Sequence, residues 1–157
     1  METINSLAAD FLSQPAIAVV GISSKRQTVA NGVYSKLKSG PRTVYAVGKN
    51  TMTFNNDPCF ANLAALPSPV QGVFIAARPE NTEQVIDDCI ALHIPRIWIH
   101  HMGGTTGSTI SPQSLQKCRD HHITVIPGAC PMMFVEGADI FHRCTKWILN
   151  ISRKLKT

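Results

Sequence analysis

The chain has 157 residues, 44% of them hydrophobic and 16% charged, which is the composition of an ordinary globular domain and not of a disordered or fibrous chain. No apolar run approaches the roughly 20 residues that a membrane span needs, and the first twenty residues contain no Lys or Arg, so we expect neither a membrane protein nor a leader peptide. The net charge of +5 arises entirely after His142, so it gives no support to nucleic-acid binding by the rest of the chain.

Cysteine and histidine usage bears on compartment and metal binding. The five cysteines form no CxxC pair and are odd in number, which argues against a secreted disulfide framework, so we expect reduced thiols and a cytoplasmic protein. The six histidines include two doublets, but neighbours in sequence point apart and no metal-ligand spacing accompanies them. We therefore expect no metal site.

Apolar periodicity divides the chain into alternating helices and strands. Ile4–Leu12 has the spacing of an amphipathic helix, and Pro15 ends it. Further helical patterns cover residues 32–38, 82–92 and 111–121, the last with Ser111 as its cap and Pro at its first position. Five short apolar runs have the character of strands buried on both faces of a parallel sheet: residues 16–21, 43–48, 72–77, 96–99 and 123–126.

The regular alternation predicts the fold class. Because parallel crossovers are right-handed, it favours an α/β, Rossmann-like, doubly wound and mostly parallel five-stranded sheet with flanking helices. We expect residues 1–157 to form a single domain with a core of about 14–131. A long amphipathic C-terminal helix is expected at about 137–155, and its apolar face either packs onto the sheet or forms a homodimer or partner contact.

A ligand of such a sheet binds beyond the carboxyl ends of the strands, so the residues after each strand are the site candidates. The loop after the first strand combines a glycine, two serines and two cations, and a second glycine follows in the next helix. Such a loop suits a diphosphate, with hydroxyls, free amides and a helix N-terminus near Asn31 as donors. A tight turn without a ligand is the other interpretation. The candidates are Gly21, Ile22, Ser23, Ser24, Lys25, Arg26 and Gly32.

The second strand ends in Val47, Gly48 and Lys49, where an NAD-binding domain commonly has an acidic residue for the ribose. A lysine favours a phosphate on that ribose, as in coenzyme A or NADP, over plain NAD. A surface lysine without a ligand is the alternative. The remaining candidates follow the third and fifth strands: Ala77, Arg78, Pro79 and Cys130.

The order of these motifs resembles the CoA-binding Rossmann-like domain, which occurs as stand-alone proteins and as the nucleotide-binding part of succinyl-CoA synthetase alpha subunits. The resemblance covers roughly residues 14–131 and includes the GxS loop, the Cys-Phe-Ala-Asn-Leu-Ala-Ala-Leu-Pro segment at 59–67, the turn at 78–80 and the Pro-Gly-Ala-Cys-Pro turn at 127–131. It implies that Gly21, Ser23 and Ser24 lie at the phosphates, 47–49 at the adenosine, and Ala77 with Pro79 beside the pantetheine.

The resemblance implies a small-molecule partner, coenzyme A or an acyl-CoA. The strand ends offer His100, His101 and Cys130 as reactive groups, but no carboxylate in sequence orients a base, so we expect binding without turnover and no catalytic residue. Two alternatives stay open. One is an NADP-dependent reductase, for which Tyr34 and Lys38 have the Tyr-x-x-x-Lys spacing; the other is a nucleotide or redox sensor that docks on a partner.

Overall fold

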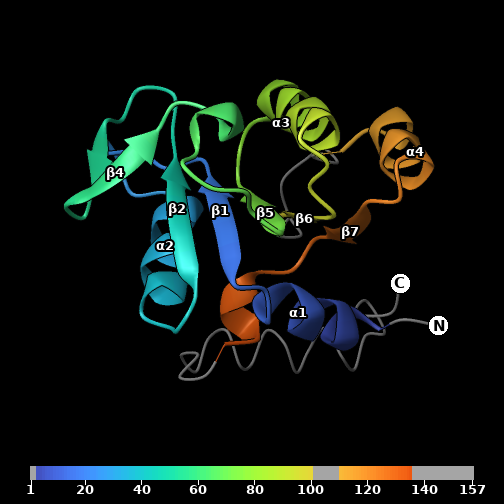
Figure 1. Ribbon diagram of the computed structural model, residues 1–157, viewed down its shortest axis with the longest axis horizontal. Helices are drawn as coiled ribbons and strands as arrows, with labels where there is room; N and C mark the ends of the chain where they lie inside the picture. Colours follow the sequence, from blue (N-terminus) through green and yellow to red (C-terminus); the bar gives the residue numbers. More distant parts are fainter. Residues whose placement is uncertain (1–2, 101–109, 136–157) are drawn as a thin grey trace.

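A computed structural model describes residues 3–100 and 110–135, which form a central β-sheet with helices on both faces (Figure 1). Within these residues the sheet has seven strands in the order β3-β4-β2-β1-β5-β6-β7. The predicted Rossmann-like, doubly wound arrangement is confirmed. Five parallel strands correspond to the five predicted runs: β1 (Ala16–Val20), β2 (Thr43–Val47), β5 (Gly72–Ile75), β6 (Arg96–Ile99) and β7 (Thr124–Pro127).

The prediction of five strands is wrong, because a hairpin extends the sheet beyond β2. Strand β4 (Asp57–Phe60) pairs with β2 in parallel, and the short β3 (Thr53–Phe54) pairs with β4 in antiparallel fashion. Asn55 and Asn56 connect them with φ of 52° and 66°, the left-handed conformation that two-residue hairpin turns require. Strands of two and four residues, one of them containing Pro58, carry too little alternation to be recognised from sequence.

The helices lie close to their predicted positions. Helix α1 (Ile4–Leu12) has the predicted bounds, and α4 (Pro112–Asp120) begins after Ser111, whose hydroxyl accepts from the Ser114 N–H. Helices α2 (Val29–Lys38) and α3 (Pro79–Ala91) each begin three residues earlier than predicted. The short 3₁₀ turns η1 (Leu63–Ala65) and η2 (Pro131–Met133) complete the described elements. None of the described helices is both long and apolar enough to cross a membrane. The helix predicted over 137–155, with its dimer or partner contact, lies outside the described residues.

Alternation of side chains along the strands separates two apolar cores. Ile17 and Val19 of β1 face a core with α1, α2 and η2, whereas Ala18 and Val20 face a core with α3, α4 and η1. In the first core the rings of Phe11 and Trp98 meet edge to face at a centroid distance of 5.4 Å. Both rings are fully buried, so truncating either to Ala is expected to cost about 3–5 kcal/mol.

The strand order determines where a ligand crevice can form. From β1 the chain passes through α2 to β2 on one side, and from β5 it passes through α3 to β6 on the other. The two crossover helices cover opposite faces of the sheet (Figure 1). The order therefore reverses between β1 and β5, and a crevice is expected at the carboxyl ends of these strands.

Candidate functional site

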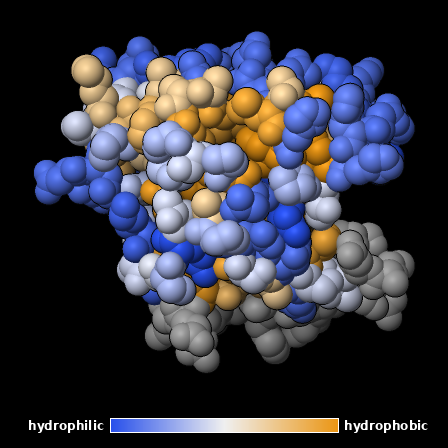
Figure 2. Space-filling model, viewed as in Figure 1, coloured by the Kyte–Doolittle hydropathy of each residue, from blue (hydrophilic) through white to orange (hydrophobic). Residues whose placement is uncertain are grey.

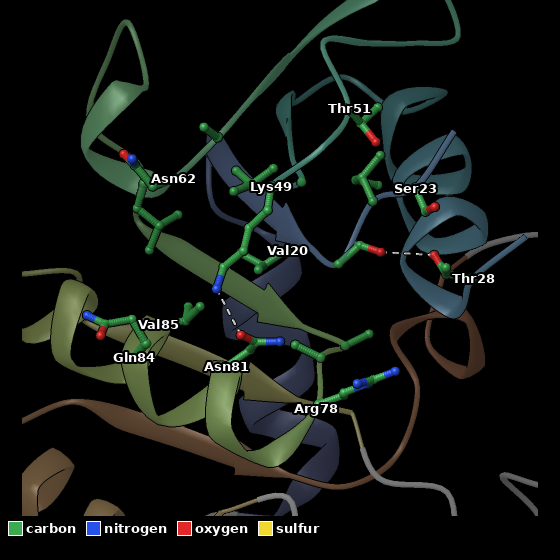
Figure 3. A pocket seen from close by; sticks show the side chains of 18 of the residues that line it. Val20, Ser23, Thr28, Lys49, Thr51, Asn62, Arg78, Asn81, Gln84 and Val85 are labelled. Atoms are coloured by element: carbon green, nitrogen blue, oxygen red, sulfur yellow. Dashed lines mark hydrogen bonds between the residues drawn. The ribbon is translucent and has the colours of Figure 1, made fainter. Parts of the chain in front are cut away.

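A cavity of about 1080 Å³ lies at this reversal point, above the carboxyl ends of β1, β2 and β5 (Figure 3). Its floor includes Val20, Val47 and Ala76, the last residues of strands or their immediate successors. The β1–α2 loop, the loop after β2, the η1 segment and one side of α3 form the walls. The volume lies slightly above the usual range of about 300–1,000 Å³ for ligand pockets, so an extended ligand fits.

Gly21 brings the end of β1 against the end of β5. Its φ is +112°, and a Cβ at this position would lie 2.2 Å from the carbonyl oxygen of Ala76. Only glycine allows both this conformation and this approach. The N–H groups of Gly21 and Ile22 both donate to the Val47 carbonyl, at 3.0 and 3.1 Å, so hydrogen bonds to the end of β2 fix the start of the loop.

The rest of the β1–α2 loop is held by Asn31, which is only 3% exposed. Its Oδ1 accepts from the N–H of Ser23 at 3.0 Å and from the Thr28 hydroxyl at 2.9 Å, and its Nδ2 donates to the carbonyls of Ser23 and Arg26. Sequence reasoning had placed Asn31 only at the helix start. A buried amide with all these partners makes the loop a preformed structure.

Most loop amides are therefore not available to a ligand, contrary to the expectation of free amides. The N–H groups of Ser24 and Lys25 donate to the hydroxyls of Thr51 and Ser23. Thr28 caps α2, and its hydroxyl accepts from the Asn31 N–H, whereas the N–H groups of Val29 and Ala30, in the first turn of α2, have no partner within the helix. The anion-binding potential of this end comes from these N–H groups, the helix dipole and the side chains of the loop.

The residues after β2 cross the cavity. A Cβ on Gly48 would lie 2.3 Å from the carbonyl oxygen of Ile22, so this glycine allows the two loops to pass in contact. Lys49 then extends over the opening, and its Nζ donates to Oδ1 of Asn81 on α3 at 2.9 Å (Figure 3). Lys49 is exposed, as a lysine that meets a solvent-accessible anion must be. Asn81, which holds it, was not predicted.

The third strand is followed by small residues and then by the start of α3. Ala76 and Ala77 line the cavity beside Gly21 and leave its centre free of bulky side chains. Arg78 is the N-terminal cap residue of α3, and its side chain makes no capping hydrogen bond. Pro79 occupies the first helical position, where its fixed φ favours helix initiation, and it does not line the cavity.

Most of the predicted site residues come together at the cavity, and four do not. Those that line it are Gly21, Ile22, Ser23, Lys25, Arg26, Val47, Gly48, Lys49, Ala77 and Arg78. Ser24 and Pro79 lie next to lining residues. Gly32 lies on α2, where the nearest atom to an added Cβ would be Met132 Sδ, at 3.8 Å. Cys130 is 3% exposed and packs in the core of α1 and α2.

Sequence reasoning missed the α3 side of the cavity. The residues at issue recur every three to four positions along one side of the helix: Asn81, Gln84, Val85, Asp88 and Leu92. This periodicity was visible in the sequence, but it marks a helix face without telling which neighbour that face meets. His100, at the end of β6, also lines the cavity, and its ring lies 6.1 Å from that of Phe74.

Tyr34 and Lys38, on which the reductase alternative rested, lie outside the cavity. Both bind Asp57 of β4, with the Tyr34 hydroxyl 2.8 Å from Oδ2 and the Lys38 Nζ 3.4 Å from Oδ1, and neither lines the cavity. Burial and the hydrogen bond to Asp57 raise the pKa of Tyr34, and the same hydrogen bond lowers the pKa of Asp57. The pair thus connects α2 to the β3–β4 hairpin.

Basic residues outnumber acidic residues along the described walls of the cavity. Lys25, Arg26, Lys49 and Arg78 line it, and within the described part of the chain Asp88 is the single acidic residue that does so. Residues 3–100 and 110–135 contain no group of three metal-ligating side chains. The described walls therefore suit a ligand with more than one anionic group.

Comparison with known proteins supports the fold and the family. The structure is similar to a hypothetical protein from Pyrococcus horikoshii OT3, with a TM-score of 0.74 and 19% identity over 85% of this chain and 91% of that one. A protein from Thermus thermophilus gives 0.68 and 17% over 92% and 98%. A dinucleotide-forming acetyl-coenzyme A synthetase of Ca. Korarchaeum cryptofilum gives 0.67 and 19%, over 79% of this chain and 27% of the synthetase.

A search of curated proteins found no match. The sequence profile of one family, described as the CoA binding domain, matches residues 15–136, which include every strand of the sheet and the whole cavity. On this match, the chain belongs to the CoA binding domain family.

Proposed function

We propose that the protein binds coenzyme A, free or as an acyl thioester, in the cavity at the ends of β1, β2 and β5, and that it does so without turnover of its own. The observation that carries the proposal is the distribution of charge along the cavity. Lys25 and Arg26 belong to the β1–α2 loop and Arg78 to the start of α3, whereas Lys49 belongs to the loop after β2. Coenzyme A has a diphosphate and a separate ribose 3′-phosphate, so its two anionic groups match cations that come from separate loops.

The residues of the chain supply defined interactions to such a ligand. The start of α2 offers the N–H groups of Val29 and Ala30, and the Ser23 hydroxyl, which accepts from the Lys25 N–H, still has its own proton to donate. Arginine and lysine side chains add charge-assisted hydrogen bonds to phosphate. The small residues Gly21 and Ala77 leave room for a narrow pantetheine chain across the sheet edge.

The same geometry disfavours NAD. At the end of β2 an NAD-binding domain commonly has a carboxylate that accepts from the ribose hydroxyls, and here Lys49 occupies that place. The sequence has no carboxylate beside the histidines that follow β6 to orient a general base, which supports binding without turnover. On the cysteine pattern we place this binding in the cytoplasm.

Isothermal titration calorimetry with coenzyme A and NAD tests the proposal. Coenzyme A is expected to bind and NAD to bind more weakly or not at all. Native mass spectrometry of the purified protein is expected to show a co-purifying ligand with the mass of coenzyme A or of an acyl-CoA. Equal or tighter binding of NAD would overturn the proposal.

A further inference from the structure

The bridge from Lys49 to Asn81 divides the cavity into two chemically different halves (Figure 3). Ser23, Thr28 and Arg78 lie on one side of the bridge, whereas Asn62, Gln84 and Val85 lie on the other. We call the second half the slot and define it by Leu63, Gln84, Val85, Asp88 and Leu92, between η1 and α3.

The slot is apolar where the other half is cationic. Leu63 and Val85 line it, and Leu92, which is 43% exposed, lies at its end. Figure 2 shows apolar side chains gathered in the upper half of this face, where Figure 1 places α3. A flat apolar group covers such surface well, whereas a phosphate gains nothing from it.

Two polar groups of α3 face the slot. Gln84 and Asp88 are one helical turn apart, and Gln84 Nε2 donates to Asp88 Oδ1 at 3.1 Å, which fixes the orientation of both side chains. The carboxylate of Asp88 repels phosphate. Because an ionised carboxylate can only accept hydrogen bonds, its partner in the ligand must be a donor. The occupant of the slot therefore combines a flat apolar body with a hydrogen-bond donor at its edge.

Resting on the proposed function, we propose that the slot holds the adenine base of the ligand and that Asp88 is a specificity-determining residue, which accepts a hydrogen bond from the exocyclic amino group. Gln84 donates to the adjacent ring nitrogen. Adenine presents a donor next to an acceptor, which is the pattern complementary to such a pair. The slot, Lys49 and the cationic end then receive the three substituents of the ribose of coenzyme A, which are the base, the 3′-phosphate and the diphosphate.

The test compares coenzyme A with its 1,N6-etheno derivative, in which a bridge on the adenine removes the amino donor and leaves the phosphates and pantetheine unchanged. Removing the charge of Asp88 also lessens repulsion of the phosphates, but this effect acts on both ligands and cancels in the ratio of their affinities. The ratio is measured by calorimetry in the wild type, in Asp88→Ala and in the control Asp87→Ala. Asp87 is the preceding residue of the same helix and pairs with Lys117 on the protein surface.

We expect the wild type and Asp87→Ala to prefer coenzyme A by about tenfold, as one charge-assisted hydrogen bond implies, and Asp88→Ala to prefer it by about threefold or less. Thermal melting establishes that all three proteins are folded. A wild-type ratio near one, or a ratio that Asp88→Ala leaves unchanged, overturns the inference while coenzyme A binding stands. If coenzyme A itself does not bind the wild type, the proposed function fails and this inference with it.

Discussion

Lys49 allows a quantitative test of how the cavity distinguishes coenzyme A from dephospho-coenzyme A. Dephospho-coenzyme A lacks only the 3′-phosphate, so the ratio of its affinity to that of coenzyme A isolates the group that Lys49 is proposed to bind. The ammonium has three N–H donors, and one of them is used by Asn81 Oδ1 at 2.9 Å. Two donors remain for a phosphate, so Asn81 positions the ammonium without competing for it.

The expected magnitude follows from this geometry. A charge-assisted hydrogen bond contributes about 1.5–3 kcal/mol, and because Lys49 is exposed we expect the lower end. About 1.4 kcal/mol is a factor of ten in affinity, so the wild type is expected to prefer coenzyme A by about tenfold at low salt. The preference decreases as salt rises, since the Debye length falls from about 10 Å at 0.1 M to about 3 Å at 1 M.

Calorimetry on the wild type and four variants distinguishes Lys49 from its competitors. Lys49→Ala is expected to lose the preference, whereas Lys36→Ala, a lysine of α2 that does not line the cavity, is expected to keep it. Lys25→Ala and Arg26→Ala are expected to weaken both ligands similarly, because these residues face the diphosphate in the proposed pose. The placement of the adenosine end is refuted if Lys49→Ala keeps the ratio and Lys25→Ala or Arg26→Ala removes it.

Three further predictions concern stability and turnover. Gly21→Ala is expected to destabilise the fold by about 1–3 kcal/mol in urea unfolding, because the added Cβ clashes with the backbone of Ala76. The control Gly32→Ala, in the open middle of α2, is expected to stabilise the fold by about 0.5–1 kcal/mol. A Gly21→Ala variant as stable as the wild type contradicts the close approach of Gly21 to Ala76. Tyr34→Phe is expected to cost about 1 kcal/mol at pH 7. Because the folded-state pKa of Asp57 is lowered, this difference is present above its unfolded pKa of about 3.9 and shrinks as the pH falls through the folded value; a difference that is constant down to low pH contradicts the assignment. The purified protein is expected to hydrolyse no acyl-CoA in a thiol-release assay, and sustained turnover that His100→Ala abolishes would reveal an active site.

The sequence by itself determined the elements whose signals are local. Continuous apolar runs predicted the parallel strands β1, β2, β5, β6 and β7, with β6 at its observed bounds, and the helical spacing of Ile4–Leu12 predicted α1. The alternation of the two patterns was enough for the doubly wound order, because crossover handedness leaves few other solutions. The strand ends then located most of the predicted cavity residues, since the carboxyl ends of parallel strands meet at one edge.

The tertiary structure decided everything that depends on which segments meet. Strands β3 and β4 form because β2 offers a free edge and Phe54 packs edge to face on Tyr34, contacts that no local pattern encodes. The side of α3 that faces the cavity, the bond of Lys49 to Asn81 across 32 residues, and the burial of Cys130 away from the cavity depend equally on long-range packing. The sequence thus determined which residues stand at the strand ends, and packing determined which of them face the cavity, because side-chain direction is set by neighbours distant in sequence.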